Sequence, residues 1–397
     1  MIKPDLMQDK NLLVIAHSYK SFVKDSVDSI SRYFEQINVF VRHNLFAEIS
    51  NILPINYLIP FTKKNLIDIT YKPNNVNVIP TRVTYLPTRK GYLNLGEKHF
   101  KAVNRQIQRN NLKKFDLIHS HFLWSSGYAA AKLKEKHDVP YVVTAHGYDI
   151  YDLPFRDRDW REQIKYVLNT ADYIITVSGS NLKCINELAV KTPVKVIPNG
   201  FYSNFFYPKG LNYCRKTLDL PVDKKIILTV GYLVEVKGHQ YLIKAMSEVI
   251  KHRKDVLCII VGSGELKNNL ERQIKKEGLE NFVKLVGGRP HNEIPDWVNA
   301  CDIFVLPSLN EGNPTVMFEC LGCEKPFVGT RVGGVPEIII SEDYGLLAEP
   351  ASPKNLAEKI LIALDKAWNY EKISKYAAQF TWEKIAKETL TVYQHVI

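Results

Sequence analysis

The chain has 397 residues, of which 45% are hydrophobic and 24% charged, a composition that permits ordinary globular cores and argues against wholesale disorder. At roughly 150 residues per domain, this length predicts two or three domains. Lysine and arginine number 53 and aspartate and glutamate 42, so the formal net charge is +11. This surplus favours an anionic partner: a nucleic acid, a membrane surface or a phosphorylated substrate.

The six cysteines are too few for a disulfide scaffold, and several lie inside apolar runs, where a free thiol behaves as a small hydrophobic side chain. This usage predicts a reducing compartment. No apolar run approaches about 18 residues, so we expect no membrane-spanning helix. Asp5 and Asp9 precede only a short apolar stretch, which is unlike a signal peptide. We therefore expect a cytoplasmic protein.

Short apolar, β-branched runs recur along the first half of the chain, with helix-like segments between them. Such runs are typical of parallel strands buried on both faces of a sheet. The first half is therefore predicted to be one α/β domain, although residues 45–90 are Pro-rich and give no clear pattern. The predicted strands are Asn11–Ala16, Ile37–Val41, Phe115–Ser120, Tyr141–Ala145, Tyr173–Val177 and Val194–Pro198.

The positive charge is concentrated between Thr81 and Lys114, where nine basic residues, Lys113 among them, and one acidic residue give +8. Residues 97–110 read as a helix with an apolar stripe and, beside it, a basic face. That face either docks on an anionic membrane surface or is a solvated face over an ordinary core. Nucleic acid is disfavoured because no zinc-finger, RNA-recognition or basic-zipper signature occurs. The basic face consists of Lys98, Lys101, Arg105 and Arg109.

A second series of strands follows residues 208–225, which read as a linker. Together the two series predict two Rossmann-like α/β domains facing each other across a cleft, with ligands bound beyond the carboxyl ends of the strands. The expected strands are Ile226–Val230, Val256–Val261, Phe282–Val286, Asp302–Leu306 and Pro326–Gly329. The expected helices are His239–Arg253, Leu266–Glu277 and Pro314–Cys323.

Two glutamates flank the predicted start of the helix at Pro314. Proline fits a first helical position, so Asn313 is the expected N-cap, and the free amides of the first turn would suit a phosphate. Glu311 and Glu319 would lie on the order of 10 Å apart, too far to attack one bond together but suited to gripping a long ligand such as a nucleotide sugar. Two surface carboxylates beside a capped helix are the alternative.

The segment Glu311–Glu319, with the downstream glycines Gly333 and Gly334, resembles the E-x7-E motif of retaining glycosyltransferases of family 4, which have the GT-B architecture. The resemblance covers most of the chain from Phe115 onward. Further matching segments are Thr229–Gly238, Val143–Gly147, Asp116–His121 and Ile197–Gly200.

The resemblance implies a role for each matching residue. Glu311 would accept hydrogen bonds from the donor sugar, Glu319 would hold the ribose, and His146 would orient the sugar. Lys237 would neutralise the departing diphosphate, and no metal or other cofactor would be needed. The loop and helix start that contact the nucleotide sugar would comprise Gly312, Asn313, Thr315 and Val316.

The chain also departs from the family pattern. Tyr232 follows Gly231 where the family usually has arginine, so Lys237 would act alone unless Arg289 or Arg331 substitutes. The first βα loop, residues 16–20, lacks glycine. His119 and His121 alternate on one strand and are candidates for lining the acceptor side. The Cys320-x-x-Cys323 pair has no companion ligands, so a metal or redox role is disfavoured.

We therefore expect an acceptor-side domain at residues 1–207, joined by a C-terminal helix at 378–397 that packs back on it, and a nucleotide-sugar domain at 208–377. Phe380, Trp382, Ile385 and Leu390 would form the buried face of that helix. The expected activity is retaining transfer of a hexose-type sugar to a lipid-linked or polysaccharide acceptor, in the cytoplasm or at the inner face of the membrane. The alternatives are a nucleotide-sugar epimerase of the same architecture and a non-catalytic nucleotide-sugar-binding subunit.

Overall fold

The computed structural model describes residues 7–51, 58, 61–86, 88–112 and 114–397, so Asp5 and Lys113 lie outside the described residues. The chain divides into two compact units. Unit 1 comprises Met1–Asn199 together with Trp382–Ile397, and unit 2 comprises Gly200–Thr381.

Unit 1 is built on a seven-stranded sheet in the order β3-β2-β1-β4-β5-β6-β7, in which neighbouring strands pair in parallel. The central strands bury nearly every residue, since helices cover both faces of the sheet. Its strands are β1 (Asn11–Ala16), β2 (Gln36–His43), β3 (Val76–Arg82), β4 (Leu117–His121), β5 (Tyr141–Ala145), β6 (Tyr173–Thr176) and β7 (Val194–Val196).

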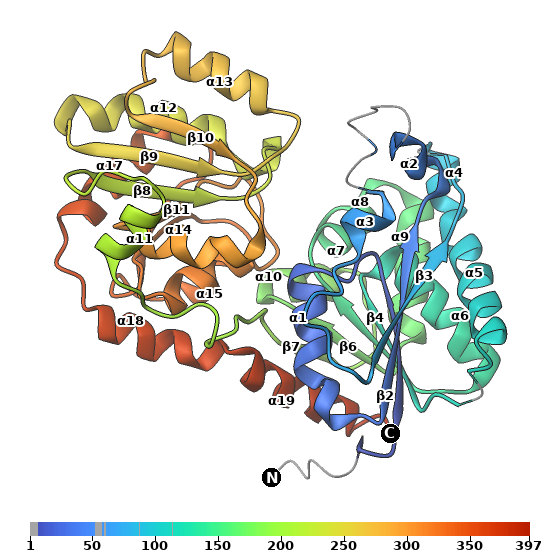
Figure 1. Ribbon diagram of the computed structural model, residues 1–397. Coiled ribbons are helices and arrows are strands. Elements are labelled where there is room, and N and C mark those ends of the chain that lie inside the picture. Colours follow the sequence, from blue (N-terminus) through green and yellow to red (C-terminus); the bar gives the residue numbers. More distant parts are fainter. Residues whose placement is uncertain (1–6, 52–57, 59–60, 87, 113) are drawn as a thin grey trace. The chain divides into compact units, whose positions relative to one another are not determined.

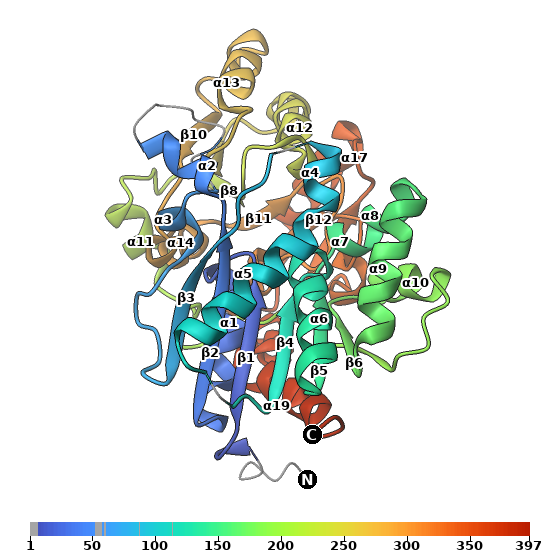
Figure 2. The same ribbon diagram turned by 90° about the vertical axis from the view of Figure 1, so that its right-hand side faces the viewer.

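The helices of unit 1 pack in two layers. In Figure 2, α5 and α6 lie side by side in front of the sheet. Helix α1 packs against α19. The main helices are α1 (Ser21–Ile30), α5 (Leu95–Arg109), α6 (Tyr128–His137), α9 (Arg158–Thr170), α10 (Gly179–Glu187) and α19 (Trp382–Tyr393). The short ones are α2 (Leu45–Glu48), α3 (Lys63–Leu66), α4 (Arg89–Leu93), α7 (Tyr148–Tyr151) and α8 (Leu153–Arg156).

Unit 2 holds a six-stranded sheet in the order β10-β9-β8-β11-β12-β13, also with parallel ladders (Figure 1). The prediction of two α/β domains with parallel sheets is therefore confirmed. Its strands are β8 (Lys225–Val230), β9 (Val256–Val261), β10 (Val283–Gly287), β11 (Ile303–Leu306), β12 (Phe327–Thr330) and β13 (Gly345–Ala348). Its helices are α11 (Leu211–Thr217), α12 (His239–His252), α13 (Lys267–Lys276), α14 (Ile294–Ala300), α15 (Thr315–Gly322), α16 (Val335–Ile338), α17 (Pro353–Asp365) and α18 (Tyr370–Ala377).

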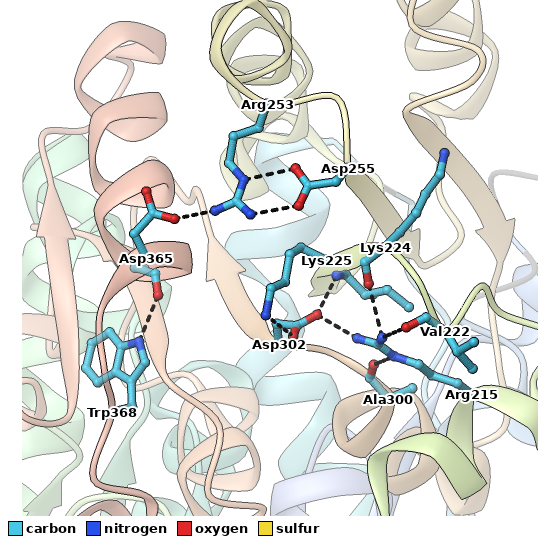
Figure 3. A network of polar contacts seen from close by, with 12 residues as sticks. Arg215, Val222, Lys224, Lys225, Arg253, Asp255, Ala300, Asp302, Asp365 and Trp368 are labelled. Carbon is cyan, nitrogen blue, oxygen red and sulfur yellow. Dashed lines mark hydrogen bonds and ion pairs between the residues drawn. The ribbon is translucent and has the colours of Figure 1, made fainter.

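The segment 208–225 is not the linker that we predicted, because it contains α11 and is fixed to the body of unit 2. The Arg215 side chain of α11 is 3% exposed and forms an ion pair of 2.6 Å with Asp302, which precedes β11 (Figure 3). Its guanidinium also donates to the carbonyls of Ala300, Val222 and Lys224. A guanidinium satisfied by this many acceptors holds the segment in place.

The ends of the units also differ from the predicted boundaries. Phe201 and Phe206 lie in the core of unit 2, so unit 2 begins before residue 208. Phe380 was expected on the face that packs on the first domain, but it packs on Phe318 and Tyr376 of unit 2. Helix α19 begins two residues later and buries Trp382, Ile385 and Leu390 within unit 1.

Candidate active site

The strand order of each sheet reverses at one place, and open α/β sheets bind ligands at such a reversal, beyond the carboxyl ends of the strands. In unit 2 the reversal lies between β8 and β11, and in unit 1 it lies between β1 and β4. The side chains that follow these four strands therefore define the two candidate sites.

In unit 2 the reversal brings Lys237 and Glu311 together from segments far apart in the sequence. Lys237 ends the short turn after β8, and Glu311 lies on the loop after β11. The Lys237 Nζ lies 2.7 Å from Glu311 Oε1, and the Ser308 hydroxyl donates to the same oxygen at 2.6 Å. The glutamate is 7% exposed, whereas Lys237 is half-buried. A buried carboxylate is thus held by two donors beside a cation that solvent can reach.

Two glycines allow the loops around this pair to pack closely. Gly238 has φ +66°, and a Cβ there would lie 2.0 Å from the Pro307 carbonyl oxygen. Gly333 has φ +51°, and a Cβ there would lie 1.6 Å from the Glu311 carbonyl oxygen. Both conformations and both approaches exclude a side chain. The Leu309 amide also donates to the Val236 carbonyl at 2.7 Å, which ties the glutamate loop to the lysine turn.

Helix α15 begins directly after this loop, one residue later than predicted. Pro314 is the N-cap and Thr315 is the first helical residue, so Asn313 is not the cap. Proline at the cap has no side-chain acceptor for the amides of the first turn, and Thr315 and Val316 are half-buried. Glu319 lies one turn into α15 and is 7% exposed.

Three further predicted residues of unit 2, Gly231, Gly312 and Tyr232, form backbone hydrogen bonds in the neighbouring loops and are not part of the Lys237–Glu311 ion pair. The Gly231 amide donates to Val261 at 3.0 Å, and the Gly312 carbonyl accepts from Gly334 at 3.0 Å. Tyr232 is 58% exposed, and its carbonyl lies 3.1 Å from the His239 ring nitrogen Nε2.

The two arginines considered as substitutes for a second cation have other neighbours. The Arg289 guanidinium lies 5.4 Å from the centre of the Trp297 ring. Arg331 pairs with Glu349 at 3.3 Å. Among the described residues, Lys237 is therefore the cation that the fold places on Glu311.

In unit 1, His146 follows β5 and is paired with His121 at the end of β4. Its Nε2 lies 3.0 Å from His121 Nδ1, and the two rings are stacked with centroids 5.2 Å apart. Burial lowers the pKa of His121 to about 4 and holds the pKa of His146 well below its usual range, with the nearby His121 adding to the effect. Both imidazoles are therefore neutral at pH 7.

Sequence reasoning did not assign a role to the rings beside His146. His17, in the glycine-free loop after β1, stacks on Phe122 after β4 with centroids 4.7 Å apart. Phe22 and Phe122 lie 4.9 Å and 4.7 Å from the His146 ring. All four rings are half-buried. The signal was their position, since His17 and Phe122 directly follow the two strands at which the order reverses.

Arg42 was also missed, because it lies inside β2 but one residue beyond the predicted strand Ile37–Val41. Its charge helps to lower the pKa of His17 and of His99, after burial itself. The Arg42 Nε and Nη1 atoms are buried and have no hydrogen-bond partner among the described residues. Half-buried Arg42 thus lies near the neutral rings of unit 1.

His119 is part of the core and does not line a ligand surface. It is 2% exposed, with its ring nitrogens 2.6 Å from the Tyr393 hydroxyl and 2.8 Å from that of Thr144. Cys320 and Cys323 are buried free thiols, and burial raises the pKa of Cys320 well above its usual range. Among the described residues, no group of three or more His, Cys, Asp or Glu side chains is placed to hold a metal ion.

Comparison with known proteins identifies the family. The family described as "Glycosyl transferases group 1" matches residues 214–380, and that described as "Glycosyltransferase Family 4" matches residues 68–203. An uncharacterised glycosyltransferase of Methanocaldococcus jannaschii is 32% identical over 314 residues, which cover 75% of this chain and 83% of that protein. The chain belongs to the glycosyltransferases of family 4.

Solved structures show the same fold over the whole length. Sucrose-phosphate synthase from Thermosynechococcus elongatus has a TM-score of 0.80 at 22% identity, covering 98% of this chain and 99% of that one. HepE from Anabaena, solved with UDP-glucose, has a TM-score of 0.74 at 21% identity, covering 98% and 100%. This glycosyltransferase therefore has the GT-B fold. Among its described residues, no helix is long and apolar enough to cross a membrane.

Proposed function

We propose that this glycosyltransferase moves a hexose-type sugar from a nucleotide-diphosphate sugar to a lipid-linked or polysaccharide acceptor, with retention of the anomeric configuration. The observation that carries the proposal is the Lys237–Glu311 pair at the β8/β11 reversal, directly ahead of the start of α15. An accessible cation, free helical amides and a held carboxylate are the groups that a diphosphate joined to a polyol requires.

In this proposal Lys237 and the amides of Thr315 and Val316 meet the diphosphate. A lysine ammonium has three donors, so Lys237 can keep its contact with Glu311 while donating to a phosphate oxygen. As the bond to the sugar breaks, negative charge builds up on the leaving diphosphate, and fixed donors stabilise it most at that moment. These groups supply positive charge without a metal, and the loop residues Gly312 and Asn313 line the approach.

The two carboxylates would bind the hydroxyls at the two ends of the donor, the transferred sugar and the ribose. Glu311 accepts from sugar hydroxyls, since Lys237 and Ser308 occupy one of its oxygens and leave the other available. Glu319, one turn into α15, accepts from the ribose hydroxyls. Neutral His146 donates or accepts a hydrogen bond with the sugar, in a tautomer set by its contact with His121. UDP-glucose bound to the HepE structure is consistent with a donor of this class.

The test is a transfer assay with UDP-, GDP- and ADP-sugars and a panel of glycan and lipid-linked acceptors. We expect one nucleotide sugar to be consumed only when an acceptor is present, and the product to keep the donor's anomeric configuration by NMR. Conversion of the donor sugar without an acceptor would support the epimerase alternative instead. Binding of a donor with no turnover on any acceptor would support the non-catalytic alternative.

A further inference from the structure

Unit 1 contains a pocket of about 880 Å³ beside β3, the edge strand of its sheet. Its walls come from α5, from the carboxyl ends of β2 and β3, and from the short helices α2 and α3. It is lined by His43, Glu48, Lys63, Pro80, Arg82, Val83, Thr84, Lys98, Lys101, Ala102, Arg105, Gln106 and Arg109.

The lining is strongly basic, with six cationic side chains and one acidic one. The spacing within α5 explains this, because residues 98, 101, 105 and 109 fall on one face of a helix while Val103 and Ile107 face the core. From Lys98 to Arg109 this face runs for about 16 Å. The pocket is therefore an elongated basic groove and not a single anion-sized hole.

Among the residues that the structure describes, few of these cations are neutralised. Lys101 pairs with Glu97 at 3.3 Å, whereas Lys98 donates to the Thr84 carbonyl at 3.1 Å and Arg105 to the Lys101 carbonyl at 3.2 Å. Among the described residues, neither Arg82 nor Arg109 forms an ion pair. Most of the charge in the groove is thus available to an external anion.

Exposed apolar side chains flank several lining residues of the same pocket in the sequence, and we refer to them as the apolar rim. They lie within a few residues of the lining residues Glu48, Lys63 and Thr84 along the chain. The Asn44 amide donates to the Tyr85 carbonyl at 3.0 Å, which joins the α2 side of this rim to the segment after β3. The exposed fractions are 39% for Leu45, 38% for Phe46, 42% for Ile49, 45% for Phe61 and 59% for Leu86.

We infer that this face of unit 1 docks on a bilayer of anionic phospholipid, with headgroup phosphates in the basic groove and the apolar rim in the interfacial layer. A basic groove beside exposed apolar side chains suits a bilayer surface, since cations are attracted to the anionic leaflet and apolar side chains partition into the interface. A soluble polyanion would use the groove but would gain nothing from the exposed leucines and phenylalanines. The inference rests on the proposed function in one respect: docking would bring the enzyme to a lipid-linked acceptor.

The first experiment measures pelleting with vesicles made of equal parts phosphatidylglycerol and phosphatidylcholine. Substituting Lys98, Lys101, Arg105 and Arg109 by glutamine should weaken binding on the order of a hundredfold, because each cation near an anionic surface contributes. The matched control removes four exposed cations of α13 in unit 2, which are Lys267, Arg272, Lys275 and Lys276. The control should bind as the unsubstituted chain does, and equal loss in both variants would overturn the inference.

The second experiment tests the rim. Phe46→Ser with Leu86→Ser should lower vesicle binding about tenfold and should leave its salt dependence unchanged, since no charge is removed. Ile340→Ser with Ile362→Ser is the control, as these exposed residues lie in unit 2. Unchanged binding of the rim variant, together with tight binding of a soluble acidic polysaccharide, would mean a polyanion groove and would overturn docking on a bilayer.

The outcome is separable from that of the proposed function. The Lys237→Ala variant should lose sugar transfer and still pellet with vesicles, whereas the four-glutamine variant should still transfer sugar to a water-soluble acceptor. Failure of the unsubstituted chain to bind either anionic or phosphatidylcholine vesicles would overturn the docking inference and leave the transferase proposal intact. Circular dichroism and thermal unfolding of each variant confirm that it is folded.

Discussion

Unit 2 places an ion pair at the reversal of its strand order, whereas unit 1 places uncharged rings at the corresponding position. In unit 2, Lys237 lies 2.7 Å from the buried Glu311 carboxylate. In unit 1, burial keeps His121 and His146 neutral, and Phe22 and Phe122 pack on the His146 ring. The same architecture thus offers fixed charge at one site and stacking surfaces at the other, which suits a charged donor in unit 2 and an uncharged sugar ring near unit 1.

The units also bury polar groups differently elsewhere. Unit 2 pairs its buried Arg215 with Asp302 and fills the remaining donors with carbonyls. Unit 1 holds half-buried Asp25 in α1, where desolvation raises the pKa of the carboxyl to about 7. We therefore expect the stability of unit 2 to respond to loss of the Arg215–Asp302 pair and that of unit 1 to respond to pH.

The largest expected effect is that of Lys237→Ala, which should lower kcat/KM for transfer about a thousandfold because the leaving diphosphate loses its cation. Steady-state transfer assays measure it. The matched control is Lys244→Ala, an exposed lysine of α12 in the same unit, which should retain full activity. Full activity of Lys237→Ala would reject the site.

Arg215→Met should lower the melting temperature by about 10 °C, because it removes the ion pair of a buried guanidinium with half-buried Asp302 and leaves the Ala300, Val222 and Lys224 carbonyls without that donor. Differential scanning calorimetry checks this, with Arg272→Met on exposed α13 as the control. A shift no larger than that of the control would mean that the buried pair does not hold α11 in place.

Glu311→Gln should lower kcat/KM about a hundredfold, since the amide keeps the contact with Ser308 but loses the charge opposite Lys237. Exposed Glu280→Gln in unit 2 is the control. If the substitution changed KM alone and left kcat intact, Glu311 would act in uniform binding and not in the transition state.

His146→Ala should lower kcat/KM about tenfold, a smaller effect because the ring orients the sugar without carrying charge. The unsubstituted enzyme should show a level rate between pH 6.5 and 8, since burial holds the pKa of His146 well below its usual range. A fall in rate with a midpoint near pH 6.5 would show an ordinary, solvated histidine. Exposed His252→Ala provides the comparison.

The smallest effect concerns Asp25→Asn, which should raise the melting temperature by a few degrees at pH 8. The pKa of Asp25 is raised to about 7, so the folded state holds this proton more tightly than the unfolded state does. The resulting contribution to the free energy of unfolding is present at low pH and is lost as the pH rises through 7. Asparagine mimics the neutral acid, so its advantage should shrink at pH 5. An advantage that grew towards pH 5 would contradict the raised pKa.

The strands that could be predicted from the sequence are those that bury both faces. β1, β5 and β9 were placed residue for residue, because each is a continuous apolar run. β3 and β13 were missed, and both are edge strands. β3 contains Pro80, and proline in a sequence usually indicates a loop. An edge strand tolerates proline because the backbone amides on its open side need no partner strand.

The candidate site was predictable to a similar degree. Lys237 and Glu311 belong to motifs, so the sequence named them, but their ion pair depends on how two loops meet. The rings of His17 and Phe122 belong to no motif, and their stacking arises only because β1 and β4 are neighbours in the sheet. Arg215 was predicted to lie in a linker, because no sequence pattern in residues 208–225 indicates that its side chain is buried.

The central claim is that unit 2 binds the diphosphate through Lys237 at the start of α15. Isothermal titration of UDP, GDP and ADP into the unsubstituted chain, Lys237→Ala and His146→Ala tests it most directly. We predict that one nucleoside diphosphate binds the unsubstituted chain and His146→Ala equally, and binds Lys237→Ala at least about thirtyfold more weakly, as the loss of a charge-assisted contact of about 2 kcal/mol requires. Equal affinity for the unsubstituted chain and Lys237→Ala would contradict the account.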